Sequence, residues 1–474
     1  MSLHPSIYDE FEYTGKWWLA GQNENKVTGT LKFSKKGIRL ELIFDQFDNF
    51  TTKDLNENIE SYIFLGDSSG GLITLIDGYS ARSTTRYSTS GILNIVKLDF
   101  ETLLVGRHFN SITDIQFKEC LVHYSNLETW LSYDPLEIIS EEENYPKIIV
   151  RNIETFEVYV NSLNAKISST FTIHSKSQRY KQEQLIYIPY IKFTTESHKT
   201  LEWFREALWH FRNFLCILTD SKVFIESMIF KNEDESNVRV YTSPSNDYEK
   251  MELDIHKDFI LALPRIEKNL EVVLNKWYEI NIKSSMLLYV NTFTRAENMV
   301  LEDIFLGYAK AVESAHRDNK VITNKFVDED VYLKTTSKML AVIKEDGSGD
   351  LYNKLAATLK YANEFGFQRR IKEVIKSLDR ELQEIVLMGM DIKYYADLVR
   401  VNRDYNTHFG ELDNMLFNPY QFININKSLK LIVLSLILEE INIPNDILLS
   451  VLHFNKRWID SIENGKAVFN IKAK

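Results

Sequence analysis

The spacing of apolar residues changes once along this chain, and that change constrains the fold more than any other feature. Up to about residue 245, apolar and polar residues alternate, as in Ile38, Leu40 and Leu42, which is typical of strands with one buried face. Beyond about residue 255, apolar residues recur every three or four positions, as in the stripe from Leu301 to Ala315. The sequence therefore predicts a β-rich region followed by a helical one.

Turns and one helix give the β-rich region its expected form. Lys35–Gly37 and Gly66–Gly71 separate strand-like segments, which predicts antiparallel hairpins in a sandwich or barrel. The segment from Lys199 to Thr219 has helical spacing instead, and we expect it to pack on a sheet. The predicted class is α+β multidomain, with an N-terminal antiparallel β-sandwich-like region carrying a packed helix and a C-terminal all-α bundle.

A chain of 474 residues is longer than one core normally organises, so two to three domains are expected. We predict a β-rich region over residues 1–245 and a helical domain over residues 255–474. The polar segment Ser243–Asp247 is the expected linker. A subdomain edge is predicted near residues 140–148, where Glu141–Glu143 precede Tyr145–Pro146.

Charge and cysteine content restrict the environment of the chain. The net charge is −11, but residues 281–474 hold 26 basic and 26 acidic side chains, which leaves 30 and 41 for the first 280. The excess acidity therefore lies in the N-terminal part, and the C-terminal part could meet RNA without that repulsion. Only Cys120 and Cys216 are present, no basic-then-apolar leader opens the chain, and the apolar run Leu431–Leu438 is too short for a membrane span. We predict a cytoplasmic protein with no membrane partner.

Several common catalytic motifs are absent from the sequence. It contains no Gly-rich phosphate loop followed by Lys-Ser/Thr, no His-Glu-x-x-His and no Gly-x-Ser-x-Gly. These absences remove the usual support for a nucleotide hydrolase, a zinc protease or a serine hydrolase. We expect neither a cofactor nor a metal.

An arginine and a histidine five positions apart, Arg403 and His408, mark the C-terminal region. The spacing alone is weak, because Arg205 and His210 repeat it on an amphipathic segment where we expect a structural role. The residues around Arg403 are polar and interrupt helices, which suits a helix start that lines a cleft. Residues five apart on a regular helix point about 140° away from each other. We therefore expect a break or a capped start, supplied by Asp404 or Asn402.

On these residues the C-terminal region resembles a HEPN domain, whose signature is an Arg, a polar residue and a closing His. Arg403, Asp404 and His408 match that signature in order and spacing. The whole chain resembles the bacterial antiphage HEPN nuclease family called ApeA. The supporting segments are Gly15–Leu19, Val27–Leu31, Ile63–Gly66, Leu72–Leu75, Asn275–Trp277 and Ala311–Arg317.

The resemblance implies a metal-independent endoribonuclease. Such chemistry needs a base for the ribose 2′-OH, a cation for the charge growing on phosphorus and an acid for the leaving 5′-oxygen. The resemblance assigns acid/base work to His408 and phosphate binding to Arg403. Asp404 would orient Arg403 or cap the helix, and Glu313 and Asn406 would support them. HEPN domains generally pair, which implies a homodimer or higher homo-oligomer with a composite site.

Four basic residues could contact the RNA backbone, because they fall on one helical stripe: Arg369, Lys372, Lys376 and Arg380. Glu373 and Asp379 flank them, so a solvated face without RNA is the alternative. His316 is interpreted as a packing residue of the bundle. Glu313 and Arg317 stand at the spacing of an ordinary ion pair.

The leading hypothesis is an RNase of phage defence that acts by abortive infection on cellular RNA, with transfer RNA as one candidate. The acidic N-terminal half would sense an unidentified phage-derived trigger or hold the nuclease in check. One alternative is a non-catalytic HEPN module that binds a nucleotide or a protein. Another is a carbohydrate- or peptide-binding sandwich, centred on residues 15–133, with a dimerising helical tail.

Overall fold

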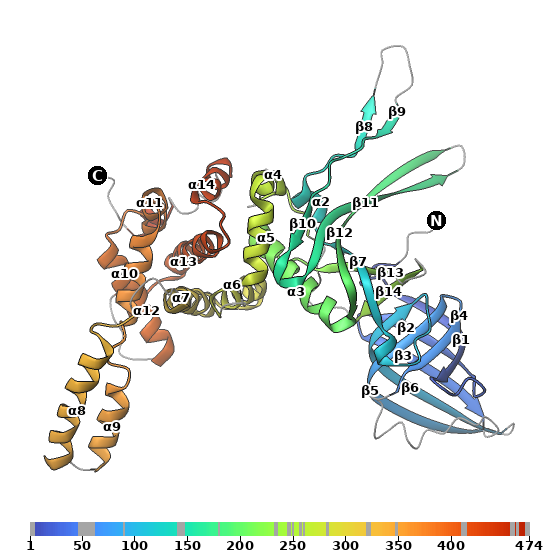
Figure 1. The fold of residues 1–474 in the computed structure, drawn as a ribbon, viewed down its shortest axis with the longest axis horizontal. Coiled ribbons are helices and arrows are strands. Elements are labelled where there is room, and N and C mark those ends of the chain that lie inside the picture. Colours follow the sequence, from blue (N-terminus) through green and yellow to red (C-terminus); the bar gives the residue numbers. More distant parts are fainter. Residues whose placement is uncertain are drawn as a thin grey trace. The chain divides into compact units, whose positions relative to one another are not determined.

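The computed structural model describes residues 5–45, 62–88, 91–139, 147–178, 181–231, 236–243, 248, 251–255, 258, 261–280, 284–318, 324–346, 349–408, 415–455, 460 and 464–469. The chain divides into two compact units, residues 1–279 and 280–474, which are described separately (Figure 1). The first is rich in antiparallel strands and carries a packed helix, and the second is helical. The predicted α+β class is confirmed.

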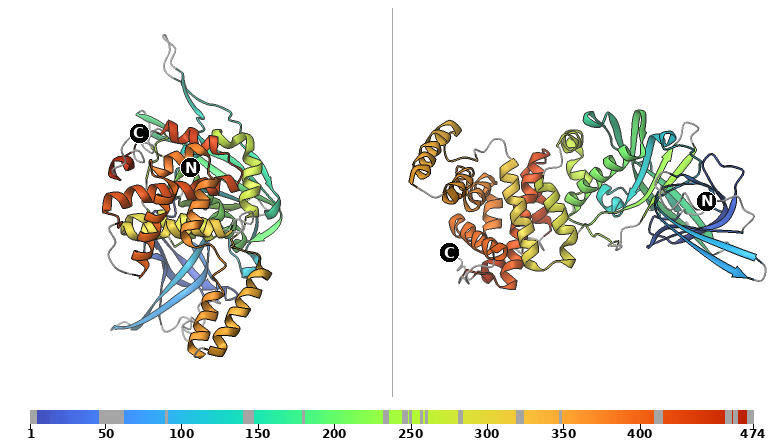
Figure 2. Two further views of the ribbon diagram at one scale, coloured as in Figure 1. Left: turned by 90° about the vertical axis from the view of Figure 1, so that its left-hand side faces the viewer. Right: turned by 90° about the horizontal axis from the view of Figure 1, so that it is seen from below.

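The first six strands of the N-terminal unit close into a barrel. They are β1 (Phe11–Leu19), β2 (Val27–Ser34), β3 (Gly37–Asp45), β4 (Phe64–Ser68), β5 (Gly71–Ser88) and β6 (Gly91–Val105). Neighbours pair antiparallel in the order β6-β3-β2-β1-β4-β5, and β5 pairs with β6 to close the ring. These strands are drawn in shades of blue in Figure 2. The predicted hairpins at Lys35–Gly37 and Gly66–Gly71 are both present. Sequence periodicity could not distinguish this closure from two stacked sheets, because both bury one face of each strand.

Trp17 fills the centre of the barrel and is fully buried. Its indole Nε1 donates a hydrogen bond to the carbonyl oxygen of Gly29 at 3.0 Å. A Cβ atom at Gly66 would lie 2.3 Å from the Trp17 ring, so the neighbouring strand can approach the ring only because that position is glycine.

The sheet continues beyond the barrel. The last four residues of β6 pair with β14 (Asn237–Thr242), and the strand order then runs through β13 (Ile225–Lys231), β7 (Gln116–Tyr124), β12 (Gln182–Thr200), β11 (Ala165–Gln178) and β10 (Glu157–Val160). Helix α3 (Leu201–Thr219) packs on β7 and β12, which confirms the helix expected there. Thr200 caps α3 by accepting a hydrogen bond from the backbone N–H of Trp203.

Shorter elements complete this unit. Helix α2 (Leu127–Leu131) follows β7 and precedes a two-stranded hairpin of β8 (Leu136–Ile139) and β9 (Lys147–Val150). The subdomain edge predicted near 140–148 falls mainly on 140–146, outside the described residues, and residues 147 and 148 belong to β9. Of the expected linker, only Ser243 is described.

Helices α4 (Leu263–Ile266) and α5 (Leu270–Glu279) belong to the N-terminal unit, although the sequence placed them in the helical half. The reason is that α5 packs against β10 and also meets α3, where the His210 and Trp277 rings stack with centroids 4.7 Å apart and each residue hydrogen-bonds the other's backbone carbonyl. The boundary between the compact units therefore follows Glu279 rather than residues 245–255. His210 has the structural role expected of it.

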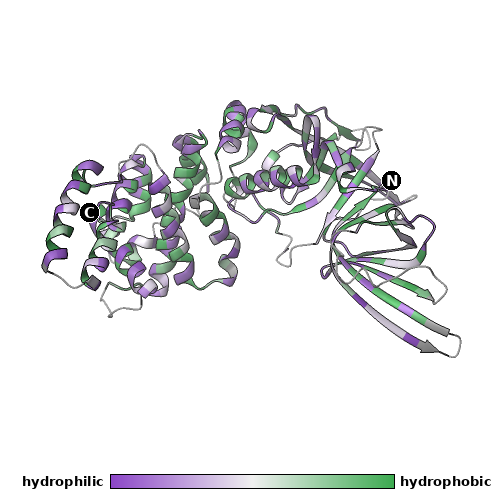
Figure 3. Cartoon of the chain, turned by 60° about the horizontal axis from the view of Figure 1, so that its bottom comes forward, coloured by the Kyte–Doolittle hydropathy of each residue, from purple (hydrophilic) through white to green (hydrophobic). Residues whose placement is uncertain are grey.

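The C-terminal unit consists of helices throughout its described part. They are α6 (Ser284–Arg295), α7 (Leu301–Asp318), α8 (Glu329–Asp346), α9 (Gly349–Leu359), α10 (Phe367–Ser377), α11 (Arg380–Leu387), α12 (Ile392–His408), α13 (Pro419–Glu440) and α14 (Asn445–Phe454). Most of these helices carry both hydrophilic and hydrophobic residues (Figure 3).

Helix α13 forms the core of this bundle. It contacts α6, α7, α11 and α14, and Asn418 and Gln421 close a reciprocal capping box at its start. The helix is long and apolar enough to cross a membrane, but 72% of its most apolar window is buried within the protein. A buried core helix explains both its length and its composition.

The helical stripe expected to carry Arg369, Lys372, Lys376 and Arg380 is divided between two helices. Leu378 is extended, and the Asp379 side chain caps α11 by accepting a hydrogen bond from the Glu381 backbone N–H at 2.8 Å. An Asp at this position satisfies a free N–H group of a new helix. The apolar spacing continued across the break and concealed it.

Candidate functional site

Arg403 on α12 is joined to α7 by a charged contact. Its Nη2 lies 3.6 Å from Oε2 of Glu313, and its Nη1 lies 3.1 Å from Oδ1 of Asp404. The guanidinium also lies 4.9 Å from the centre of the Phe367 ring on α10. Three helices therefore fix this side chain, while about a third of it remains exposed.

Glu313 links Arg403 to a wider charged network. Its Oε1 accepts a hydrogen bond from Nη2 of Arg317 at 3.0 Å. Arg317 lies 3.8 Å from Glu364, which also pairs with the buried Arg370 at 2.9 Å. The structure thus brings the predicted supporting residue Glu313 into contact with Arg403, and the Glu313–Arg317 pair is also present.

Asn402 was interpreted from sequence as a helix interrupter, but it is a buried anchor with 1% of its surface exposed. Its amide donates hydrogen bonds to the backbone oxygens of Leu398 and Met415, and its Oδ1 accepts one from the backbone N–H of Phe417 at 2.7 Å. Asn402 thus ties the chain leading into α13 to α12. Sequence reasoning missed this role, because a buried Asn and a capping Asn look alike without the tertiary partner.

The break expected between Arg403 and His408 is absent, because α12 is continuous from Ile392 to His408. Arg403 lies near the end of the helix rather than at its start. Asp404 does not cap a helix; its carboxylate contacts Arg403 and, at 3.5 Å, Arg400. The polar side chains are accommodated without a break because Asn406 and Thr407 donate to carbonyl oxygens one turn earlier in the same helix.

The continuous helix separates the two signature residues. Residues five apart on an α-helix point about 140° away from each other and lie about 7.5 Å apart along its axis. His408 is the last residue of α12 and is exposed. Within one chain, Arg403 and His408 therefore point to different sides of the end of α12.

The four basic residues do not share one helix, which corrects the expected stripe. Arg369, Lys372 and Lys376 are on α10, whereas Arg380 begins α11 and pairs with Glu384 at 3.2 Å. Arg369 pairs with Glu373 at 3.0 Å and stacks 3.6 Å from the centre of the Phe365 ring. Among the residues that the structure describes, Lys372 and Lys376 form no ion pair, so they are the cations of the set available to an anion.

His316 packs inside the bundle, as interpreted from the sequence. It is 1% exposed, and its Nε2 lies 3.4 Å from Oε2 of Glu373. Burial lowers the pKa of His316; the hydrogen bond to Glu373 opposes that shift, and the charge of Arg370 adds to it.

Two family matches cover most of the chain. Residues 12–277 match the family described as ApeA N-terminal domain 1, and residues 306–447 match the one described as Apea-like HEPN. No curated protein and no solved structure matches the chain. The fold and the second match define a HEPN-type helical domain that follows a β-rich domain.

The chain belongs to the ApeA family, and at family level this assigns it a HEPN nuclease-like role in antiphage defence. The part matched to the HEPN family includes the signature residues Arg403 and His408. It also includes Glu313, Asp404 and Asn406.

Proposed function

We propose that the chain is a metal-independent endoribonuclease that cleaves cellular RNA during phage infection and so stops growth of the infected cell. The observation that carries the proposal is the placement of Arg403. Glu313 and Asp404 hold it at the end of α12, and the exposed His408 follows one and a half turns later. A fixed guanidinium and an exposed imidazole are the side chains that RNA cleavage without metal requires.

The chemistry assigned to these residues is attack by the ribose 2′-oxygen on the adjacent phosphorus. His408 takes the proton from the 2′-OH or gives one to the leaving 5′-oxygen, and Arg403 stabilises the charge on the phosphorane. The bond between phosphorus and the 5′-oxygen breaks, which leaves a 2′,3′-cyclic phosphate and a 5′-hydroxyl. Glu313, Asp404 and Asn406 act as positioning residues.

A homodimer explains how two residues that diverge on one helix can serve one phosphate. If two copies of α12 face each other, Arg403 of one chain can lie near His408 of the other. We therefore propose that the site is composite and that each chain contributes one of the two groups.

The test is cleavage of total cellular RNA and purified tRNA by the full chain in EDTA. We expect cleavage by the parent and its loss in Arg403→Ala and His408→Ala. Arg295→Ala and His453→Ala are matched controls, because both residues are exposed and lie elsewhere in the same unit. Cleavage retained by both site variants would contradict the assignment.

A second candidate function is a non-catalytic HEPN module that binds a nucleotide or a protein. The observation that favours it is that Glu313 and Asp404 already contact the Arg403 guanidinium, and a phosphate must compete with both. In that case the parent binds RNA or nucleotide without cutting, and Arg403→Ala weakens binding while His408→Ala does not.

A further inference from the structure

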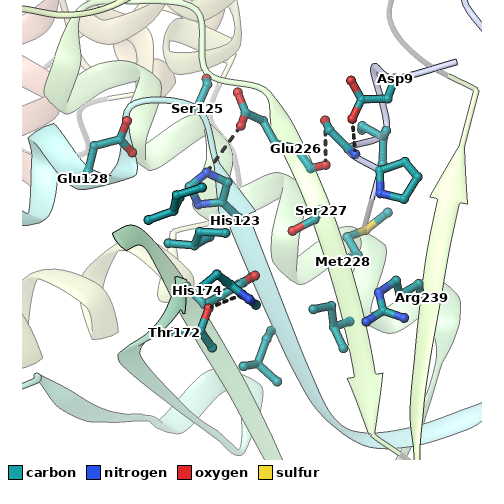
Figure 4. Close-up of a pocket in the computed structure, with 18 of the residues that line it drawn as sticks. Asp9, His123, Ser125, Glu128, Thr172, His174, Glu226, Ser227, Met228 and Arg239 are labelled. Carbon is teal, nitrogen blue, oxygen red and sulfur yellow. Dashed lines mark hydrogen bonds and ion pairs between the residues drawn. The ribbon is translucent and has the colours of Figure 1, made fainter. Parts of the chain in front are cut away.

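The N-terminal unit contains a cavity of about 1090 Å³ that has no part in the proposed cleavage site. It lies on the face opposite α3 of the sheet region beyond the barrel: Leu121 and His123 of β7 line it, whereas the alternate residue Tyr124 points the other way and donates a hydrogen bond to the Leu208 carbonyl of α3. Figure 4 shows His123 among the residues that line the cavity. The segment from Pro5 to Glu10 contributes to one wall.

That wall is held to the sheet by backbone contacts. The backbone N–H of Ile7 donates to the carbonyl of Glu226 at 3.0 Å, and the Tyr241 hydroxyl donates to the carbonyl of Pro5 at 3.3 Å. Residues far apart in sequence therefore build the cavity together, and its shape is set by the fold.

Arg239 on β14 is the unusual residue in this cavity. It is half-buried, and among the described residues no carboxylate pairs with it. Loss of solvent lowers the pKa of Arg239, and the nearby Tyr241, Tyr190 and Tyr13 oppose that shift. Partly buried arginines are normally paired with an anion, because desolvating an unpaired charge costs free energy. The guanidinium therefore offers donors to an anionic group from outside the chain.

The cavity is acidic away from Arg239. Glu128 and Arg239 lie on opposite sides of the close-up in Figure 4. Glu128 forms no ion pair with any residue that the structure describes, whereas Glu226 is engaged by His123 at 3.3 Å and by the Tyr248 hydroxyl at 3.1 Å. Lys231, the other strong cation of the lining, is paired with Glu119 at 2.7 Å. Among the described residues, Glu128 is thus one of several lining carboxylates without an ion pair, whereas Arg239 is the lining's strong cation without one.

The remaining lining is apolar and aromatic, with Ile188, Tyr190 and Met228 among its members. The cavity volume lies just above the range for small-molecule pockets, about 300–1,000 Å³. Five carboxylates, on Asp9, Glu10, Glu128, Glu226 and Glu252, disfavour a polyanion such as nucleic acid. A ligand that fits this lining carries a carboxylate, a cationic group and apolar groups, spread over the length of several residues. A segment of polypeptide has these groups at that spacing.

We propose that this cavity binds a segment of polypeptide. An acidic group of the segment pairs with Arg239, apolar side chains cover Ile188 and Met228, and a basic group lies near Glu128. The site does not depend on the proposed nuclease activity.

The test uses the full chain and a library of N-acetylated octapeptides, followed by fluorescence anisotropy on the peptides retained. We expect retained peptides to contain Asp, Glu or a free carboxyl terminus. Arg239→Gln should weaken their binding at least about tenfold, as for a buried charge-assisted contact. Glu128→Gln should weaken only peptides that also carry Lys or Arg. Arg82→Gln, at an exposed arginine of β5, is the matched control and should change nothing.

A second variant, Ser227→Phe, tests the proposal even if Arg239→Gln does not fold. Ser227→Phe fills the cavity while keeping Arg239, and it should also abolish binding. Thermal unfolding of each variant shows whether its fold is intact. The proposal is overturned if no peptide is retained, if folded Arg239→Gln or Ser227→Phe binds as the parent does, or if ATP or an oligonucleotide binds there instead in an Arg239-dependent way.

Discussion

Arg403 on α12 and Glu313 on α7 form an ion pair, with Nη2 and Oε2 3.6 Å apart, between helices that are separated by more than 70 residues of sequence. The Glu313 side chain is mostly buried, so the pair is screened less than a surface pair. Glu313 thus ties α7 to the arginine to which we assign phosphate binding, and Asp404 and the Phe367 ring are its other contacts.

The first prediction concerns this pair. Glu313→Gln should reduce RNA cleavage, because the guanidinium then loses one of the two carboxylates that hold it and the charged contact with α7, while the unfolding free energy falls only slightly. A double-mutant cycle with Arg403→Gln in urea unfolding should give a coupling of about 0.5–1 kcal/mol. Glu384→Gln, at the exposed pair with Arg380, serves as the control and should leave cleavage unchanged. Unchanged cleavage by Glu313→Gln would remove the positioning role.

The second prediction concerns Asn402. Asn402→Ala removes the partners of the Met415 carbonyl and the Phe417 N–H and should lower the unfolding free energy by about 3 kcal/mol. Denaturant unfolding measures this decrease, and Asn406→Ala is the comparison, because within the part of the chain that the structure describes its side chain bonds to its own helix. Equal decreases in the two variants would show that the tertiary contact adds no stability.

The third prediction is a pH dependence of stability set by His316. Burial holds the pKa of His316 below its ordinary value of 6.5, so the unfolded chain binds a proton more readily than the folded one. The contribution of neutral His316 is complete above pH 6.5 and is lost as the pH falls below it. The melting temperature of the parent should therefore fall more between pH 7 and pH 5 than the melting temperature of His316→Gln. His453→Gln, at an exposed histidine, should follow the parent. Identical pH profiles for parent and His316→Gln would contradict the assigned direction.

The fourth prediction separates the basic residues. Replacing Lys372 and Lys376 with Gln should weaken RNA binding. It should also make the binding constant less dependent on salt: the slope of its logarithm against the logarithm of the salt concentration should become shallower by about 0.7 for each phosphate that the variant no longer neutralises. Arg380→Gln should have little effect, because that guanidinium is exposed and already paired with Glu384. Filter binding in the catalytically silent His408→Ala background at several salt concentrations provides the measurement. If Arg380→Gln reduces the salt dependence of RNA binding more than the lysine variants do, the assignment of Lys372 and Lys376 as RNA contacts is wrong.

Much of the fold follows from periodicity in the sequence. Alternating spacing correctly placed the strands that flank the turns at Lys35–Gly37 and Gly66–Gly71. Apolar residues three to four positions apart correctly placed the helix that ends at Thr219. Closure of β5 onto β6 could not be predicted, because the pairing of distant strands leaves no local pattern. The break at Asp379 was missed for the opposite reason, since the apolar stripe continues across it.

The candidate site was only partly predictable. The identities of Arg403 and His408 came from a short signature, and the contact of Glu313 with Arg403 agrees with the supporting role assigned to it. The geometry did not follow from the sequence: a helix break was expected, but the helix is continuous. Hydrogen bonds from Asn402 to residues 13 and 15 positions away stabilise the segment, and such tertiary partners cannot be recognised from one sequence.

The most direct test of a composite ribonuclease site is a mixed-subunit experiment. Arg403→Ala and His408→Ala proteins, each inactive alone, are unfolded and refolded together in equal amounts and assayed for RNA cleavage in EDTA. If each site takes Arg403 from one chain and His408 from the other, half of the dimers are mixed and each has one intact site, so activity should return to about a quarter of the parent's. A mixture as inactive as its components would contradict the composite site.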